Sequence, residues 1–113
     1  MHEMSLAEGV LGIVEETARR EGIRAVRAVR LEIGQLAAVE TAALRFCFES
    51  VVRGSIAEGA RLEIDETPGQ AWCFRCCASV PLASRVDPCP GCGGSQLQVS
   101  GGTQMRVKDL EVA

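Results

Sequence analysis

The sequence is poor in aromatic side chains and has no excess of positive charge. Aromatic residues make up 4% of the 113 residues, tyrosine is absent, and the formal net charge is −3. Proteins that bind nucleic acid usually present a basic surface, and those that bind single strands add aromatic platforms for base stacking. These two shortages argue against nucleic acid as a partner.

Long apolar runs and a basic leader are also missing. No apolar run approaches the roughly 20 residues that cross a bilayer, and the opening segment is charged and contains glycine. We therefore expect a soluble, cytoplasmic protein with no membrane partner. A reducing compartment suits six cysteines held as thiols or metal ligands, and a disulfide framework is the alternative for a secreted chain.

The residues of the common catalytic sets are scarce. His2 is the only histidine, so a Ser-His-Asp or Cys-His set would have to use it. The chain has no glycine-rich phosphate-binding loop ending in Gly-Lys-Ser or Gly-Lys-Thr. We expect no enzymatic activity, and any nucleotide hydrolysis would have to come from a partner protein.

Four of the cysteines form two Cys-x-x-Cys pairs separated by twelve residues. Each pair can fold into a tight turn that directs both sulfurs to one point. The four ligands are Cys73, Cys76, Cys89 and Cys92. Four thiolates in tetrahedral geometry suit zinc or iron, and Zn²⁺ is the favoured occupant. A closed site of this kind leaves no position for substrate, so the pattern predicts structural zinc.

The two remaining cysteines have other predicted roles. Cys77 is a leftover thiol beside Cys76, with a bystander role favoured over that of a substitute ligand or redox partner. Cys47 falls on the apolar stripe of a predicted helix, where it should behave as a small hydrophobe.

Apolar periodicity predicts two helices and three strands. The expected elements are a helix from Leu6 to Glu21, a strand from Ile23 to Gly34, a helix from Thr41 to Arg53, a strand from Arg61 to Glu66 and a strand from Gln104 to Val112. Ser5 is the expected N-cap of the first helix and Gly22 its C-cap. The apolar parity of the last strand changes near Lys108 and Asp109, which predicts a β-bulge there.

This order predicts an α+β fold with two helices on a three-stranded β-sheet and a small four-cysteine zinc-ribbon module inserted before the last strand. The predicted domains are a metal-binding α+β domain of residues 1–67 and 103–113 and a zinc-binding module of residues 68–102.

The start of the chain is a second candidate metal site. The amine of Met1, the imidazole of His2 and the amide nitrogen between them lie within reach of one ion, and nitrogen-rich tetragonal surroundings suit Ni²⁺ or Cu²⁺. Groups near Glu3 would complete the ligand set. The alternative is that His2 is an untethered bystander. Glu40 could approach this end, although its simpler role is a favourable charge at the start of the second helix.

Several motifs together resemble the HypA/HybF family of hydrogenase nickel-incorporation proteins. They are Met1-His2-Glu3-Met4-Ser5-Leu6, Gly34-x-Leu36 with Glu40, Phe46-x-Phe48-Glu49, Ala57-Glu58-Gly59-Ala60, the cysteine quartet and Leu110-Glu111-Val112. The resemblance covers essentially the whole chain. Gln104 departs from it, because the family commonly has a glutamate there, and the usual proline near Glu40 is absent.

The resemblance implies a function and partners. It implies a metallochaperone that delivers Ni²⁺ to the [NiFe]-hydrogenase large subunit with the GTPase HypB, and that serves urease and its accessory proteins in some organisms. It also implies that His2 is a nickel ligand and that the cysteine quartet holds zinc. We expect a monomer or a weak homodimer. The rival interpretation is a zinc-ribbon protein-interaction module that delivers no nickel.

Overall fold

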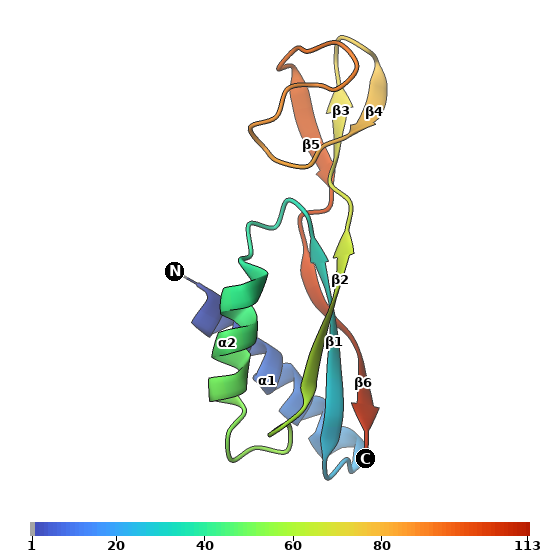
Figure 1. Cartoon of the computed structure of the whole chain (residues 1–113). Coiled ribbons are helices and arrows are strands. Elements are labelled where there is room, and N and C mark those ends of the chain that lie inside the picture. The colour runs from blue at the N-terminus through green and yellow to red at the C-terminus, as the bar shows by residue number, and fades with distance from the viewer. Residues whose placement is uncertain (1) are drawn as a thin grey trace. The chain divides into compact units, whose positions relative to one another are not determined.

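The computed structural model describes residues 2–113, which form two compact units. The elements in chain order are α1 (Glu3–Glu21), β1 (Val26–Gly34), α2 (Thr41–Val51), β2 (Arg61–Thr67), β3 (Gln70–Cys73), β4 (Ala78–Pro81), β5 (Leu97–Gly101) and β6 (Met105–Val112) (Figure 1). The first unit comprises the chain up to Leu31 together with Val39–Ile64 and Val107–Ala113, and the second comprises Glu32–Ala38 and Asp65–Arg106. Among residues 2–113, no helix is both long and apolar enough to cross a bilayer.

The first unit is built on the sheet with strand order β2-β1-β6. Strands β1 and β2 point the same way and β6 runs in the opposite direction (Figure 1). Parallel neighbours need a crossover connection, and α2 supplies it. Both helices lie on one side of the sheet (Figure 1). The predicted α+β class, with two helices on a three-stranded sheet, is confirmed.

The helices bury one stripe each against this sheet. The buried positions of α1 recur three or four residues apart and those of α2 do the same. They are Ala7, Val10, Val14 and Ala18 in α1 and Leu44, Cys47 and Phe48 in α2. Cys47 is 8% exposed, so its predicted role as a small core hydrophobe is confirmed.

The prediction for the start of α1 is wrong. The helix begins at Glu3, with His2 as N-cap, and Ser5 lies exposed within the first turn. The N–H of Leu6 donates to the carbonyl oxygen of His2 at 2.9 Å. This bond makes residues 2–6 the first helical turn, so Ser5 lies inside the helix and not at its start. At the other end the prediction is confirmed, because Gly22 caps the helix with a left-handed φ of 69°.

Four other boundaries differ from the predictions by one to three residues. Strand β1 begins at Val26 rather than Ile23, and β2 ends at Thr67 rather than Glu66. Helix α2 ends at Val51 rather than Arg53, and β6 begins at Met105 rather than Gln104. A turn follows the end of α2. In this turn the hydroxyl of Ser55 donates a hydrogen bond to the carbonyl of Val52 at 2.6 Å, which holds the chain out of the helix path.

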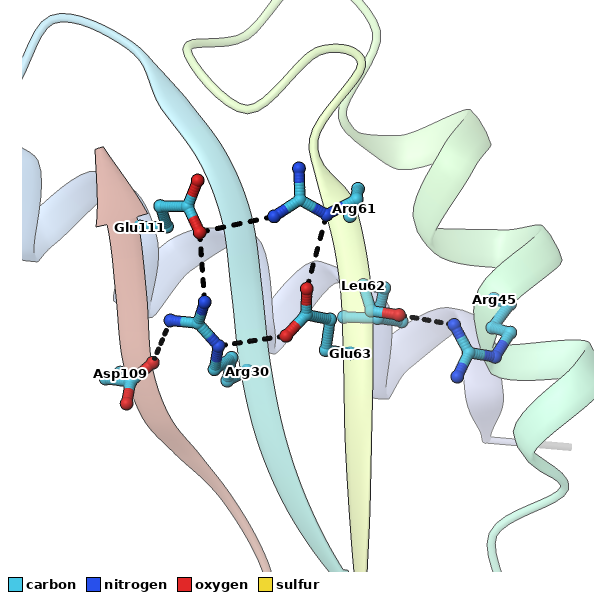
Figure 2. Close-up of polar contacts among 7 residues, drawn as sticks. All are labelled: Arg30, Arg45, Arg61, Leu62, Glu63, Asp109 and Glu111. Carbon is cyan, nitrogen blue, oxygen red and sulfur yellow. Dashed lines mark hydrogen bonds and ion pairs between the residues drawn. The ribbon is translucent and has the colours of Figure 1, made fainter. Parts of the chain in front are cut away.

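The sheet face opposite the helices carries a network of ion pairs (Figure 2). Arg30 on β1 binds carboxylates on both neighbouring strands. Its partners are Glu63 at 2.9 Å, Asp109 at 2.9 Å and Glu111 at 3.0 Å. Hydrogen bonds to Asp109 and Glu63 raise the pKa of Arg30 above its ordinary value.

The same face supports the predicted bulge in β6. Arg106 binds Glu32 at 2.8 Å, and Asp109 binds Arg30. Arg30 and Glu32 are two residues apart on β1 and therefore share a face. Positions 106 and 109 are three residues apart and would lie on opposite faces of a regular strand. An irregularity between them explains how both reach the same face of β1.

The second unit contains a sheet that the sequence analysis missed. Its strand order is β4-β3-β5 and all pairs are antiparallel, with Trp72 opposite both Ser79 and Gln98. Its small core consists of Leu36, Ala71 and Leu82, flanked by Val80, Leu97 and Val99. Leu36 comes from the connection between β1 and α2, so this core draws on two separate segments of the chain.

Two glycines allow backbones to pass closely within the second unit. A Cβ atom on Gly34 would lie 2.1 Å from the carbonyl oxygen of Gly102, and one on Gly69 would lie 2.1 Å from that of Leu82. Any side chain at either position would force the backbone to move.

Candidate metal centres

The four predicted zinc ligands converge in the second unit. The Sγ atoms of Cys73, Cys76, Cys89 and Cys92 all lie within 4.8 Å of one another. The sulfurs of Cys73 and Cys92 are 3.7 Å apart, and those of Cys76 and Cys89 are 3.9 Å apart. Tetrahedral zinc with bonds of about 2.3 Å requires sulfurs about 3.8 Å apart. The cluster therefore fits a zinc ion.

In each Cys-x-x-Cys pair a backbone N–H points at the first sulfur, from the fourth residue in the first pair and from the third in the second. The N–H of Cys76 lies 3.4 Å from the sulfur of Cys73, and the N–H of Gly91 lies 3.4 Å from that of Cys89. The residue after each pair has a left-handed backbone, with φ of 51° at Cys77 and 72° at Gly93. Cys77 therefore occupies the position after the first pair that Gly93 occupies after the second.

The environment of the thiols favours loss of a proton at one sulfur. Backbone N–H groups of Cys92 and Gly91 lower the pKa of Cys89 to about 7, against the opposing effect of burial. Hydrogen bonds with Cys73 and Cys92 raise the pKa of Cys76 to about 12. A metal ion bound by four thiolates would displace these protons, so metal uptake is expected to weaken as pH falls.

The chemistry of the donor set indicates a structural site. Cys73 and Cys89 are fully buried, and four thiolates fill the tetrahedral shell. The cluster is thus suited to hold a structural metal such as zinc, with no coordination position left for a reaction. Cys77 is exposed and lies outside the cluster, with its thiol 3.5 Å from the carbonyl of Phe74.

The second candidate site lies at the start of α1. Met1, whose amine was a predicted ligand, lies outside the described residues. The side chain of His2 is 52% exposed, and its Nδ1 atom is 3.5 Å from the carboxylate of Glu3. The imidazole of His2 and the carboxylate of Glu3 are therefore neighbours. The prediction that both groups bind one ion requires this.

Glu3 is the buried acidic residue of this end, with 5% of its surface exposed. Its Oε2 atom accepts a hydrogen bond from the backbone N–H of Glu40 at 3.2 Å. This bond is the largest cause of the lowered pKa of Glu3, and the neighbouring His2 adds to it. The carboxylate therefore stays ionised and ties the first turn of α1 to the start of α2.

Glu40 has the helix-end role that its position predicts. Its side chain accepts a hydrogen bond from the N–H of Ala42 at 2.9 Å and so caps α2. Glu40 thus approaches the start of α1 through its backbone, while its carboxylate is engaged with its own helix.

Two comparisons of sequence identify the family. The family described as "Hydrogenase/urease nickel incorporation, metallochaperone, hypA" matches residues 1–112. The chain belongs to the HypA family. A relative named "Hydrogenase maturation factor HypA" from Azotobacter chroococcum mcd 1 is 60% identical over 112 residues, which cover 99% of each chain. One with the same name from Albidiferax ferrireducens is 59% identical over 112 residues, again 99% of each.

Solved structures show the same fold. The solution structure titled "Solution structure of the Ni metallochaperone HypA from Helicobacter pylori" matches with a TM-score of 0.69 at 23% identity, over 99% of this chain and 97% of that one. A second HypA solution structure matches with a TM-score of 0.70 at 24% identity. The HypA resemblance inferred from the motifs is therefore confirmed, and the chain is a member of a nickel-incorporation family named for hydrogenase maturation.

Sequence reasoning overlooked two residues of these regions. Leu36 was assigned no role, although it lies in the core of the unit that holds the cysteines. The left-handed backbone of Cys77 was also overlooked. The glycine that follows the second Cys-x-x-Cys pair was the available signal for Cys77, because equivalent turns need equivalent conformations.

Proposed function

We propose that this chain carries Ni²⁺ at its amino-terminal end and releases it for assembly of the [NiFe]-hydrogenase active site. The ligand residue is His2, with the amine of Met1 and groups of Glu3 as further contributors and Glu40 as a further candidate. The observation that supports this proposal is the anchoring of Glu3 by the N–H of Glu40, because it places an exposed imidazole at a fixed helix end.

Electrostatics at this end favour weak binding that can be reversed. The N-termini of α1 and α2 both carry positive partial charge, which disfavours a bound cation. The ionised carboxylate of Glu3 offsets this charge at the first of the two helices. A carrier must both bind its cargo and give it up, and opposing charges of this kind serve both needs.

The proposed division of labour follows the chain. Residues 1–67 and 103–113 form the nickel-binding domain, and residues 68–102 form the zinc-binding module, which has a structural role. Residues 32–38 contribute to the compact unit of the cysteines as well. The protein is a carrier with no catalytic activity of its own.

The proposed partners follow from family membership. They are the GTPase HypB, which would supply nucleotide hydrolysis, and the [NiFe]-hydrogenase large subunit, which would receive nickel. Urease accessory proteins are further proposed partners, since the family description names urease. We place these encounters in the cytoplasm, where the chain would act as a monomer or weak homodimer.

Isothermal titration of Ni²⁺ into zinc-loaded protein tests the proposal. The protein must carry no tag ahead of Met1, because a tag would remove the free amine. We expect His2→Ala to lose nickel binding while its circular dichroism and zinc content stay unchanged. Glu8→Ala, an exposed acidic change on the same helix, is the matched control and should bind like the wild type.

The opposite result has a defined meaning. Equal binding in wild type and His2→Ala, or none in either, would support a zinc-ribbon interaction module without nickel delivery. Affinity should also fall as pH falls, because protons compete with the metal for nitrogen ligands.

A further inference from the structure

The two edges of the first unit's sheet differ in how they are protected. Strands β2 and β6 are the edge strands. On the outer side of β2, away from β1, the guanidinium of Arg45 on α2 donates a hydrogen bond to the backbone carbonyl of Leu62 (Figure 2). A side chain that occupies an edge carbonyl blocks pairing with another strand. The β2 edge is therefore blocked at Leu62.

A groove of about 480 Å³ lies beside β6, between this strand and α1. Its lining is mainly apolar and includes Ile13, Ile23, Val107, Leu110 and Val112. Ile13 is 52% exposed and Val112 is 47% exposed. Leu110 and Val112 of β6 occupy the helix-side face of the sheet, because the neighbouring Asp109 and Glu111 reach Arg30 on the opposite face.

Helix α1 and strand β6 both line this groove, α1 with Ile13 and Thr17. A helix with its side chains is about 10 Å wide, whereas neighbouring strands are spaced about 4.8 Å apart. A fourth strand beside β6 would lie under the exposed side chain of Ile13, and every second side chain would enter the groove. An added helix fits less well, because it would leave the hydrogen-bonding edge of β6 unused.

We propose that β6 and this groove bind an extended segment of a partner protein as a fourth strand. The segment carries apolar residues at every second position, facing α1, and polar residues between them. Its main chain pairs with the outer edge of β6 on the C-terminal side of the bulge. The charged residues that line the groove are Glu21, Asp109 and Lys108, an acidic excess of one, so a basic residue at one end of the segment complements Glu21.

Nuclear magnetic resonance on the full, zinc-loaded chain tests this site. The probe is a synthetic octapeptide with valine and threonine in alternation and a lysine at each end. A peptide of the same composition with its valines grouped together is the control. We expect the alternating peptide to shift the amides of residues 110–112, to protect those that point away from β1, and to shift the amides around Ile13. We expect the grouped peptide to have no effect there.

Two protein variants and a modified peptide distinguish strand pairing from nonspecific hydrophobic binding. Ile13→Glu should weaken binding at least about tenfold, whereas Phe46→Glu, at a more exposed apolar position on α2, should leave it unchanged. A peptide methylated on the backbone nitrogens that face β6 should not bind the wild type, because it cannot pair.

Three results would overturn the proposal. They are equal binding of the alternating and grouped peptides, shifts confined to other regions, and a dimer of this chain that Ile13→Glu abolishes while no peptide binds. The last result would make a second copy the occupant of the groove. Nickel binding is measured separately at His2, so failure here leaves the proposed nickel function standing.

Discussion

The two candidate metal centres differ in almost every physical respect. The cysteine cluster gathers four identical soft ligands from residues 73–92 and buries two of them fully. The amino-terminal site places one exposed imidazole beside one anchored carboxylate at the end of a helix. The first arrangement is suited to keep its ion and the second to exchange it. A complete shell of four thiolates is suited to retain a metal ion. An open site with mixed ligands is suited to release one.

Removing one cysteine ligand should have the largest effect. Cys73→Ser leaves three thiolates, and structural zinc sites contribute apparent free energies of about 10–16 kcal/mol to folding. We expect loss of zinc and unfolding of the second unit, while the helices of the first unit persist. Metal analysis and circular dichroism measure the two effects. Cys77→Ser is the control and should keep its zinc, so equal loss in both variants would contradict the assignment.

Truncating Leu36 tests whether the cysteine unit depends on a distant segment. Its side chain is 3% exposed in the small core with Ala71 and Leu82. Leu36→Ala should destabilise this unit by about 2–4 kcal/mol through the cavity it leaves. Denaturant unfolding followed by the fluorescence of Trp72, the only tryptophan, reports on the change. Ile13→Ala, at a half-exposed position, should have little effect by the same measure.

Neutralising Glu3 tests how the open site is held in place. Glu3→Gln keeps the size of the side chain but loses the charge in the bond with the N–H of Glu40, so we expect a lower melting temperature. Because the pKa of Glu3 in the folded protein lies below its ordinary value of 4.5, its stabilisation is complete above that pH. This stabilisation is lost as pH falls through the lowered pKa.

Melting curves between pH 3 and pH 7 measure this dependence, with Glu8→Gln as an exposed control on the same helix. The difference between wild type and Glu3→Gln should shrink toward low pH. A difference that stays constant over this range would show that the charge of Glu3 does not matter.

The smallest expected effect is a gain in stability at Cys77. Its left-handed backbone costs a residue with a side chain about 1 kcal/mol relative to glycine. Cys77→Gly should raise the stability of the zinc-loaded protein by about this amount, measured by denaturant unfolding. Gly93→Ala should lower it by a similar amount, since it places a side chain at the matching position of the other turn.

Local signals predicted much of the fold and one of the two sites. The cysteine quartet could be assigned because each pair lies within four residues, and two such pairs are typical of a four-thiolate zinc site. The C-cap at Gly22 and the stripe that includes Cys47 were equally local. Periodicity also predicted the two helices and the three strands of the first sheet.

Features that depend on distant contacts could not be predicted. Helix α1 starts at Glu3 rather than Leu6 because the carboxylate of Glu3 is bound by a backbone N–H 37 residues away. Strands β3 to β5 have four or five residues each, too few for a clear alternation. Leu36 appeared to be a loop residue because its packing partners come from the segment after residue 65.

The origin of Leu36 has a consequence for protein engineering. A peptide that contains only the cysteine segment would lack this side chain and would expose Ala71 and Leu82 to water. A graft of the module into another scaffold would therefore need a host loop that supplies a leucine in its place. The boundaries of a transplantable zinc module are set by this packing, and they do not coincide with any single stretch of the chain.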